Sequence, residues 1–495
     1  MRSTAAYSIN TLIGPLFTIV FTPIYIRVLT QSDLGTVALV RTLGMIVSVF
    51  GTLGLATAMG VLLHDQPDDE AQMRMLSTAI WLGTGFSAML VFAGVLLQAP
   101  LARIWLGNVQ FATVVALYLI NLPFGALYSL YVGALRLRQE AWRASLLGVV
   151  QVVLLAVFSL SLVVWLRLGV VGVLGAEVLT YTCLSALCIM LAPRYFFALP
   201  RALWERWQPL LLARQLLLTG LPLVPSGLAV WALGYVDRPI LQQMGIDLAT
   251  IGVYDVANKL ASMVALVSVP FQAAWTPFAL AIQNQPNAPR VYARILTYYM
   301  AGMLGVALAL GLFAREILLV FATPDYLEAH RFVWLLAYAA PIQGSTIILA
   351  IGLYLSKRTV HLAWTATVGA AVNIGLNLLL VPRLGVLGAA IATPLGYLCG
   401  PVATYVVAQR ARPIPYDLPR LALALGTQFV LVVVGLQWSA ATTPLTIGIR
   451  AALLLVYPLL LILFGVISRA EFEQARAWLR WRWGARRGAR NATNE

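Results

Sequence analysis

The chain has 495 residues, of which 61% are hydrophobic and only 10% are charged, and its formal net charge is +15. Because a soluble domain contains about 25% charged residues, this composition excludes an ordinary soluble protein and indicates a polytopic membrane protein. A basic excess is also typical of nucleic-acid-binding proteins, but here the charges lie between apolar segments. We therefore expect membrane lipids, and no nucleic acid, among the partners.

A membrane helix needs roughly 20 predominantly apolar residues, and the chain offers about fourteen such segments. We therefore predict an all-α polytopic membrane protein. The first segment follows a single arginine, is interrupted by polar residues and has no small-residue cleavage site, so we interpret it as a retained helix rather than a signal peptide. The expected helices cover residues 5–27, 34–62, 75–98, 110–134, 144–166, 169–191, 215–236, 250–281, 291–313, 331–354, 359–381, 384–408, 417–437 and 446–467.

The basic residues are divided unequally between the two ends of these helices. If the N-terminus is cytoplasmic, 23 of the 33 lysines and arginines fall on the inward side, eight fall on the outward side, and Arg41 and Lys259 lie inside the membrane. The positive-inside rule then places both termini in the cytoplasm, with an even number of spans and with the turn around Arg167 facing outward. The eight outward residues are Arg27, Arg103, Arg167, Arg238, Arg315, Arg331, Arg383 and Arg450.

The chain lacks the usual signatures of catalysis. Its three cysteines and three histidines have no metal-ligand or redox spacing, and neither of its two lysines ends a phosphate-binding loop. We interpret the cysteines as packing residues inside membrane helices. We therefore expect no enzymatic activity, no bound metal and no cofactor, and we expect that ATP hydrolysis within this chain does not drive its function.

Two polar stretches lie outside the predicted membrane helices. Residues 200–214 carry four charges among tryptophans and leucines, which predicts a surface helix linking two halves along the cytoplasmic face. The tail from residue 468 combines tryptophans with arginines, and it either contacts anionic lipid or forms a solvated basic end. The expected domains are an N-terminal six-helix bundle at 1–195, the interfacial linker at 196–214, a C-terminal six-helix bundle at 215–412, two additional helices at 413–468 and the basic tail at 469–495.

An internal repeat relates the two six-helix bundles. The sequence Arg167-Leu-Gly-Val-Val-Gly172 recurs as Arg383-Leu-Gly-Val-Leu-Gly388, an offset of 216 residues, and residues 34–37 match residues 251–254 at an offset of 217. Repeats with an even number of helices run in the same direction and are related by an axis along the membrane normal. In this register Arg41 corresponds to Asn258, the neighbour of Lys259, so each half contributes one cation about two turns into its second helix.

Charged residues interrupt the apolar stretch 231–270, and among them are Asp237, Arg238, Asp255 and Lys259. A charge at the centre of a membrane helix costs about 2.5–3.5 kcal/mol, so such residues usually face a water-filled cavity or a partner. Counting from Asp255, polar side chains follow at i+3, i+4 and i+7, which is one face of a helix. This narrow polar stripe on an otherwise apolar helix predicts a substrate cavity.

The candidate substrate-binding set combines these residues with cations elsewhere. For Arg27 and Arg238 the alternative is snorkelling to the interface, and for Asp255 it is neutralisation of Lys259 within the helix. Asp237 and Glu177 are candidates for a coupling proton or cation, whereas Asn373 and Asn377 favour hydrogen bonds between helices. The substrate-binding candidates are Arg41, Lys259, Arg27, Arg238, Asn258 and Asp255, with Tyr7, Thr11, Gly14, Thr18, Thr22 and Tyr25 as a polar stripe on the first helix.

Four short motifs accompany the two six-helix halves. They are the run from Arg27 to Arg41, Gly-Leu-Pro-Leu-Val-Pro at 220–225, Tyr-Val-Asp-Arg at 235–238 and Ile-Gly-Val-Tyr-Asp-Val-Ala-Asn-Lys-Leu at 251–260. With these motifs the chain resembles the polysaccharide-biosynthesis flippases of the multidrug/oligosaccharidyl-lipid/polysaccharide exporter superfamily. The resemblance covers about residues 5–410, and its motifs specify the superfamily better than the substrate. It implies a V-shaped pair of bundles that moves an undecaprenyl-diphosphate-linked oligosaccharide across the membrane by alternating access.

The resemblance implies export of O-antigen, capsule or exopolysaccharide units, with a polysaccharide polymerase and chain-length proteins as further candidate partners. The two extra helices are similar to those of lipid II flippases of the same superfamily, so that substrate stays open. A multidrug or organic-cation exporter is the second function, and a membrane glycosyltransferase or polymerase is the third. We expect the halves to rock as rigid bodies, with the first, second, seventh and eighth helices as the moving walls.

Overall fold

The structure, a computed structural model, describes residues 21–197, 208–358, 360–438 and 442–467. These residues form helices joined by short connections, and thirteen of the helical segments are long and apolar enough to cross a membrane. The prediction of an all-α polytopic membrane protein is confirmed. Of the first expected helix, only residues 21–27 are described, and they are helical. Its residues Tyr7, Thr11, Gly14 and Thr18, and the basic tail, lie outside the described residues.

The N-terminal bundle contains the helices of the first half of the chain. Apolar runs of more than 20 residues form its long helices α4, α6 and α8, and Asp68 caps α4 by accepting a hydrogen bond from the backbone of Ala71 at 2.7 Å. The elements are α2 (Gln31–Thr52), α3 (Leu55–Leu62), η1 (Leu63–Asp65), α4 (Asp69–Leu96), α5 (Gln98–Leu106), η2 (Val109–Phe111), α6 (Ala112–Leu137), α7 (Ala141–Ser159), a π-helical turn (Leu160–Trp165) and α8 (Gly169–Leu191).

The C-terminal bundle follows the connecting helix α10 and ends at α20, and two further helices, α21 and α22, pack on its outer side. Its elements are α10 (Gln208–Gly220), η4 (Leu221–Leu223), α11 (Val224–Tyr235), α12 (Asp237–Gln243), α13 (Leu248–Ala261), η5 (Ser262–Val264), α14 (Ala265–Ala281), α15 (Ala288–Phe321), η6 (Pro324–Ala329), α16 (His330–Leu336), α17 (Ala339–Leu349), α18 (Ile351–Leu355), α19 (Val360–Leu384), α20 (Val386–Ala411), α21 (Leu418–Leu436) and α22 (Pro444–Leu463).

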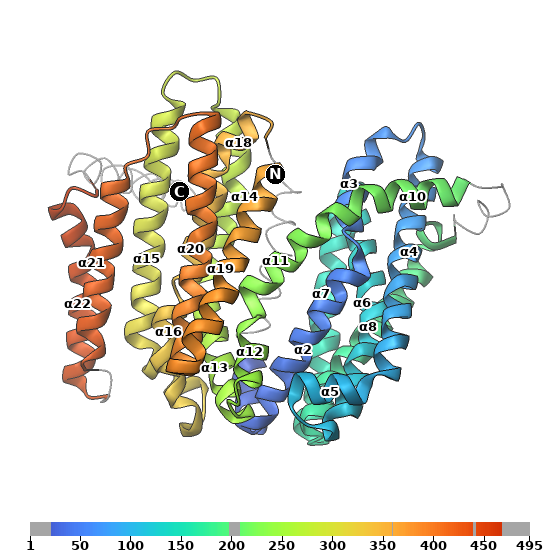
Figure 1. Ribbon diagram of the computed structural model, residues 1–495, viewed down its shortest axis with the longest axis horizontal. Coiled ribbons are helices and arrows are strands. Elements are labelled where there is room, and N and C mark those ends of the chain that lie inside the picture. Colours follow the sequence, from blue (N-terminus) through green and yellow to red (C-terminus); the bar gives the residue numbers. More distant parts are fainter. Residues whose placement is uncertain (1–20, 198–207, 359, 439–441, 468–495) are drawn as a thin grey trace, which may run out of the picture.

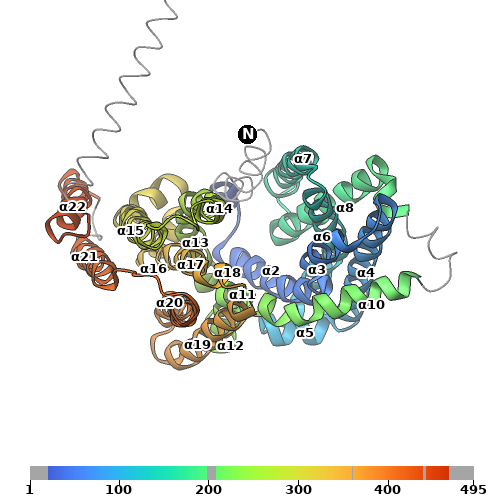
Figure 2. The same ribbon diagram turned by 90° about the horizontal axis from the view of Figure 1, so that it is seen from above.

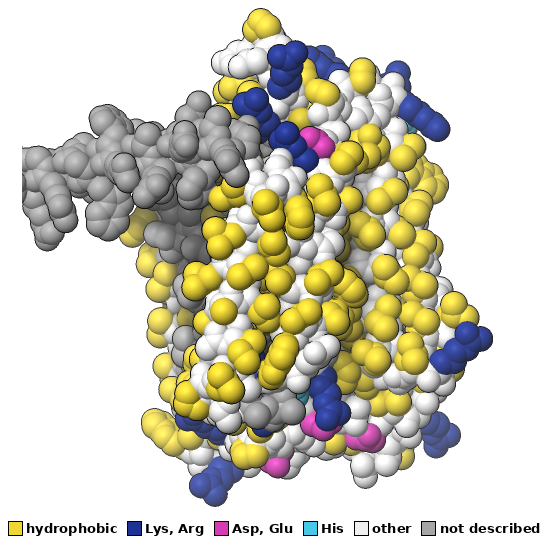
Figure 3. Space-filling view, turned by 90° about the vertical axis from the view of Figure 1, so that its left-hand side faces the viewer, with side chains coloured by type: hydrophobic (Ala, Val, Ile, Leu, Met, Phe, Trp, Pro, Cys, Tyr) yellow, Lys and Arg dark blue, Asp and Glu magenta, His cyan; other side chains and the backbone are white. Residues whose placement is uncertain are grey.

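The two bundles stand side by side and meet at one end (Figure 1). There, at the bottom of the view, α2 and α5 approach α12 and α13, and towards the top the ribbons of the two bundles diverge. Seen from above, α2 and α11 lie between the bundles, and α21 and α22 lie at the edge of the C-terminal bundle (Figure 2). On the face formed by this edge, apolar side chains make a broad band with basic side chains gathered above and below it, as expected for a surface in contact with lipid (Figure 3).

Several expected helices are broken at left-handed residues or at 3-10 turns. The segment expected as one helix at 34–62 divides into α2 and α3, because Leu53 and Gly54 adopt left-handed conformations with φ of 49° and 68°. The helix expected at 215–236 begins earlier, at Gln208, and breaks at the 3-10 turn that contains Pro222. Residues 198–207 of the predicted surface linker lie outside the described residues, but α10 runs through Arg214 and crosses the top of the N-terminal bundle (Figure 1).

At the end where the bundles meet, α2 and α13 cross through two glycines that correspond in the repeat. A Cβ atom on Gly35 would overlap the backbone oxygen of Leu248, and one on Gly252 would overlap the backbone oxygen of Gln31. Both pairs are related by the offset of 217 residues, so the contact is reciprocal, as at a two-fold interface. The turn glycines Gly169 and Gly385 likewise share a φ of 57° at the offset of 216. These observations are compatible with the predicted repeat.

The two extra helices are fixed to the C-terminal bundle by a buried ion pair. Arg450 of α22, with no exposed surface, forms an ion pair with Glu316 of α15, and its guanidinium also donates a hydrogen bond to the backbone oxygen of Trp438. From the sequence, Arg450 is one of the eight outward residues, and the structure adds that its side chain is buried against α15. Its partner Glu316 lies 134 residues earlier in the chain. The positions of the expected helices therefore do not predict this ion pair.

Because a buried charge without its partner is expensive, Arg450→Leu is expected to destabilise the packing of α22 by about 3–5 kcal/mol, and Arg450→Leu with Glu316→Leu by much less. Thermal unfolding of the purified protein in detergent measures both. The matched control is Arg331→Leu, since Arg331 forms its ion pair with Glu328 where both side chains are about two-thirds exposed. Equal melting temperatures for the Arg450 and Arg331 variants contradict the anchoring role.

Candidate functional site

A cavity of about 280 Å³ lies between the two bundles. Arg41 stands ten residues into α2 and Lys259 eleven residues into α13, which at 1.5 Å per residue is about 15 Å from the start of each helix. The lining residues are Ala38, Arg41, Thr42 and Met45 of α2, Tyr235 of α11, Arg238 of α12, and Asp255, Asn258, Lys259 and Ser262 of α13.

On the N-terminal side of the cavity, the cation is Arg41. Its Nε donates a hydrogen bond to a carboxylate oxygen of Glu177 in α8 at 2.8 Å, and one of its Nη atoms contacts the same oxygen. The side chain of Arg41 keeps a quarter of its surface exposed, whereas that of Glu177 keeps 12%. Glu177 is therefore an ion-pair partner behind the cation, which orients the guanidinium while its outer part faces the cavity.

On the C-terminal side, Arg238 lies inside a cluster of charges and is only 3% exposed. It pairs with Asp237 at 2.8 Å and with Asp255 at 3.0 Å. Asp237 also accepts a hydrogen bond from the hydroxyl of Tyr254 at 2.5 Å. The alternative that Arg238 snorkels to the interface is wrong, because two carboxylates compensate its charge within the protein.

Lys259 shares one of these carboxylates. Its ammonium lies 2.8 Å from the second oxygen of Asp255, and its side chain is 21% exposed. The ion pair between Asp255 and Lys259 within one helix is confirmed, but Arg238 holds the other oxygen of the same carboxylate. If Lys259 turns towards a bound anion, Asp255 keeps a cationic partner, so the exchange leaves no uncompensated buried charge.

The charges that line the cavity are three cations and one carboxylate. The other two carboxylates, Asp237 and Glu177, pair with the arginines without lining the cavity. Anions attract guanidinium and ammonium groups through charge-assisted hydrogen bonds, which are about twice as strong as neutral ones. The cavity is therefore suited to a negatively charged group of a ligand. In the described part of the chain, no three His, Cys, Asp or Glu side chains come together as they do at a metal site.

The structure brings together five of the six substrate-binding candidates, and Arg27 is the exception. Arg41, Arg238, Asp255, Asn258 and Lys259 line one cavity. Arg27 instead donates a hydrogen bond to the backbone oxygen of Val320 at 3.1 Å, where it joins the end of the first helix to α15. The interhelical hydrogen bond expected of the asparagines is formed by Asn373, which donates to the backbone oxygen of Ala392 in α20 at 3.2 Å.

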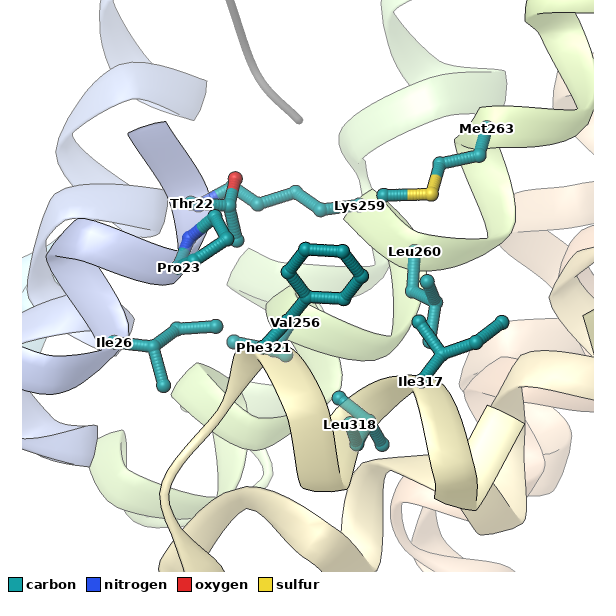
Figure 4. A pocket seen from close by; sticks show the side chains of 10 residues that line it. All are labelled: Thr22, Pro23, Ile26, Val256, Lys259, Leu260, Met263, Ile317, Leu318 and Phe321. Carbon is teal, nitrogen blue, oxygen red and sulfur yellow. The ribbon is translucent and has the colours of Figure 1, made fainter. Parts of the chain in front are cut away.

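An apolar crevice lies beside the cavity, and of its residues the sequence predicts only Thr22 and Lys259 as cavity-lining. It lies between the end of the first helix, α13 and α15, and its volume is about 30 Å³. In Figure 4 the side chain of Lys259 extends from α13 towards Thr22 and Pro23, above Phe321. Apolar residues give no signal in a chain that is apolar throughout, so only the packing of these three helices identifies them. The lining residues are Thr22, Pro23, Ile26, Val256, Lys259, Leu260, Met263, Ile317, Leu318 and Phe321.

Solved structures with the same fold include transporters and a flippase. A lipid II flippase in an inward closed conformation is 13% identical, with a TM-score of 0.68 over 94% of this chain and 100% of the other. An inward-facing multidrug resistance transporter of the MATE family is 16% identical, with a TM-score of 0.64 over 86% and 99% of the two chains. A MATE transporter from Vibrio cholerae is 15% identical, with a TM-score of 0.56 over 83% and 98%. These likenesses show that the chain shares its fold with these proteins.

No curated protein matches the sequence. Residues 1–283, however, match the family described as polysaccharide biosynthesis protein. This match covers more than half of the chain and includes α2 and α13, the two helices that provide Arg41 and Lys259. The chain is thus a multi-pass membrane protein that belongs to the polysaccharide biosynthesis protein family.

Proposed function

We propose that this protein is a flippase that moves an undecaprenyl-diphosphate-linked oligosaccharide across the cytoplasmic membrane by alternating access, for O-antigen, capsule or exopolysaccharide synthesis. One observation carries the proposal: the cationic cavity between the bundles and the apolar crevice meet at Lys259, which lines both. A lipid-linked sugar needs both environments at one point, because its diphosphate joins a polar head to a hydrocarbon chain.

The charged part of the cavity fits the diphosphate. Arg41 and Lys259 approach it from opposite bundles, and each keeps between a fifth and a quarter of its side chain exposed. A diphosphate has enough oxygens to bind both cations, and binding it would join the two halves of the protein through one ligand. The side chains of Thr42, Asn258 and Ser262 add hydrogen-bonding groups for the sugars.

The apolar crevice fits the first part of the hydrocarbon chain. It is lined by Pro23 and Ile26 of the first helix, by Leu260 and Met263 of α13, and by Phe321 of α15. Its small volume is too little for a polyprenyl chain, so the chain would leave between the end of the first helix and α13 towards the bilayer. The head would then pass through the protein while the tail stays in lipid, which avoids moving the hydrocarbon through a polar path.

A multidrug or organic-cation exporter is the second candidate, and the carboxylate of Asp255 in the lining favours it. The likeness to a lipid II flippase supports a third, with the same diphosphate chemistry but a different sugar. Arg238 and Lys259 both hold Asp255, however, so this carboxylate is a poor partner for an added cation. The charges of the lining therefore support an anionic substrate over a cationic one.

Translocation in proteoliposomes tests the function. The purified protein is reconstituted with an undecaprenyl-diphosphate-linked sugar labelled on one leaflet, and the label that becomes accessible to a membrane-impermeant reagent is measured over time. We expect the protein to accelerate translocation, and an excess of undecaprenyl diphosphate to inhibit it, while an organic cation such as ethidium has no effect. Transport of ethidium without movement of the lipid-linked sugar would instead establish the exporter.

The proposal includes an orientation, with the divergent end of the bundles in the cytoplasm. In a variant without native cysteines, Arg358→Cys, between α18 and α19, is expected to resist a membrane-impermeant maleimide in intact cells, whereas Arg331→Cys, at the start of α16, is expected to react. Both side chains are exposed. Permeabilised cells provide the control, since both positions should then react. Reaction of Arg358→Cys in intact cells reverses the orientation.

A further inference from the structure

Three arginines converge on a second cavity, of about 230 Å³, between α15 and α21. It shares no lining residue with the cavity between the bundles or with the apolar crevice. Arg290 and Arg294 come from the first two turns of α15, and Arg420 comes from the first turn of α21. Asp417, Thr297 and Tyr298 also line the cavity.

The arrangement concentrates positive charge on one side of the fold. Arg290 and Arg294 are four residues apart on one helix, a spacing at which like charges repel and destabilise the helix. The packing of α21 on α15 then adds a third guanidinium to the same cavity, against a single carboxylate in the lining. An anion bound in the cavity would accept charge-assisted hydrogen bonds from these guanidinium groups.

The contacts of Arg420 hold its guanidinium in place. Its Nε lies 2.9 Å from a carboxylate oxygen of Asp417, and the other oxygen of Asp417 accepts a hydrogen bond from the backbone N–H of Arg420 at 3.1 Å. A guanidinium carries five N–H donors, and this ion pair uses the Nε side of it. Arg290 is exposed at the mouth of the same cavity. The cavity therefore combines one oriented guanidinium with a neighbour free to adjust its rotamer.

The position of this cavity favours a lipid as the source of the anion. Both helices begin at the upper end of the molecule (Figure 1), and basic side chains gather at the upper end of the face shown in Figure 3, directly above the apolar band. Leu418 and Leu423, on either side of Arg420 in α21, are each over 40% exposed. A lipid phosphate at the arginines would thus have its acyl chains beside exposed apolar side chains.

We propose that Arg290, Arg294 and Arg420 form a binding site for a phosphate group, supplied by the headgroup of an anionic phospholipid in the adjacent leaflet. The guanidinium forks bind the phosphodiester oxygens, and the glycerol and acyl chains extend along α21 towards the apolar band. The site is independent of the proposed function, since it takes a structural lipid on the outer side of the C-terminal bundle and not the transported molecule.

The test measures the thermal unfolding of the purified full-length protein in detergent while single ligands are added. Phosphatidylglycerol is expected to raise the melting temperature saturably, and diacylglycerol with the same acyl chains is not, because it lacks the phosphate. In the variant Arg290→Gln with Arg420→Gln, the apparent Kd for phosphatidylglycerol is expected to weaken at least about tenfold. The variant Arg290→Lys with Arg420→Lys keeps the charges and should retain part of the binding.

Arg358→Gln is the matched control, because Arg358 is an exposed arginine in the turn before α19, at the same end of the molecule, and does not line the cavity. It should bind phosphatidylglycerol like the unchanged protein. Unaltered binding by the double glutamine variant, or an equal effect of diacylglycerol, overturns the site. If inorganic phosphate alone produces the whole shift, the phosphate chemistry stands and the lipid source is wrong.

Discussion

Neutralising Lys259 is expected to lower export by about 10- to 100-fold while the protein remains folded in the membrane. The size follows from the loss of one charge-assisted hydrogen bond to the substrate, worth about 1.5–3 kcal/mol. Lys259→Gln should preserve the fold because Arg238 remains 3.0 Å from Asp255 and still compensates that carboxylate. The measurement is surface polysaccharide in a strain that depends on this protein, normalised to the amount of protein in the membrane.

The same substitution at Arg238 should behave differently. Arg238→Gln leaves Asp237 and Asp255 without a buried guanidinium. We therefore expect the free energy of unfolding to fall by about 3–5 kcal/mol, so that the amount of folded protein decreases rather than transport alone. This pair of variants separates a cation that binds substrate from a cation that supports the site. If Lys259→Gln exports normally at equal protein levels, the anionic-substrate proposal is wrong.

For Arg41, the partner must be changed as well. Arg41→Gln alone leaves Glu177 charged and largely buried, so the informative variant combines it with Glu177→Gln. We expect this double variant to fold and to lose export by a factor similar to Lys259→Gln. Arg41→Lys should retain part of the function, since it keeps the charge and loses the guanidinium fork. If the variant that combines Arg41→Gln, Glu177→Gln and Lys259→Gln exports normally, neither Arg41 nor Lys259 is needed for transport.

Filling the space at the crossing of α2 and α13 is expected to abolish most of the export. Gly35→Leu places a side chain where the backbone oxygen of Leu248 lies, so the two bundles cannot meet as they do in this structure. Overpacking costs about 1–3 kcal/mol, which shifts a two-state equilibrium by about 5- to 150-fold. We expect the variant to populate conformations separated at this end and to lose most of its export. Gly252→Leu should have the same effect, because the contact is reciprocal.

Other hydrogen bonds stabilise the arrangement of the two bundles, both at this end and nearer the cavity. Gln31 donates a hydrogen bond to the backbone oxygen of Asp325 at 2.6 Å, and Trp231 of α11 donates one to the backbone oxygen of Thr42 in α2 at 3.0 Å. Asp247 caps α13, and the hydrogen bonds that it accepts from Thr250 hold its pKa below the usual range of a carboxyl group. One glycine substitution therefore competes with a set of favourable contacts, so a population shift is expected rather than a separated pair of bundles.

Spin labels on Gln110→Cys and Glu328→Cys, at the closed ends of the two bundles, measure the conformation. The distance distribution should broaden towards longer distances in Gly35→Leu. The control is Gly302→Leu, because a Cβ on that helical glycine of α15 meets nothing within 4 Å. An unchanged distribution together with normal export in Gly35→Leu rules out separation at this crossing as part of the transport cycle.

Much of the membrane architecture follows from the sequence because its causes are local. Twenty apolar residues in a row form a helix in lipid, since the backbone has no other hydrogen-bonding partner there. The repeat spacing related Gly35 to Gly252, and the i, i+4 spacing paired Asp255 with Lys259. The helix breaks that were not predicted also have local causes, but these causes cannot be recognised in the sequence. The break at Leu53 and Gly54 interrupts an apolar run with a glycine, and glycines occur throughout this chain.

The sequence by itself determined that the chain lies in a membrane, that it forms helices, and that Arg41 and Lys259 lie within membrane helices, because these depend on composition and helical spacing. Only the tertiary structure decided what each charge does. Arg41 finds Glu177 136 residues away, Arg238 is enclosed between two carboxylates, Arg450 is buried against Glu316, and Arg290 meets Arg420 across two helices. Ion pairing and burial depend on which helices pack together, and contacts over such separations leave no periodic signal in a single sequence.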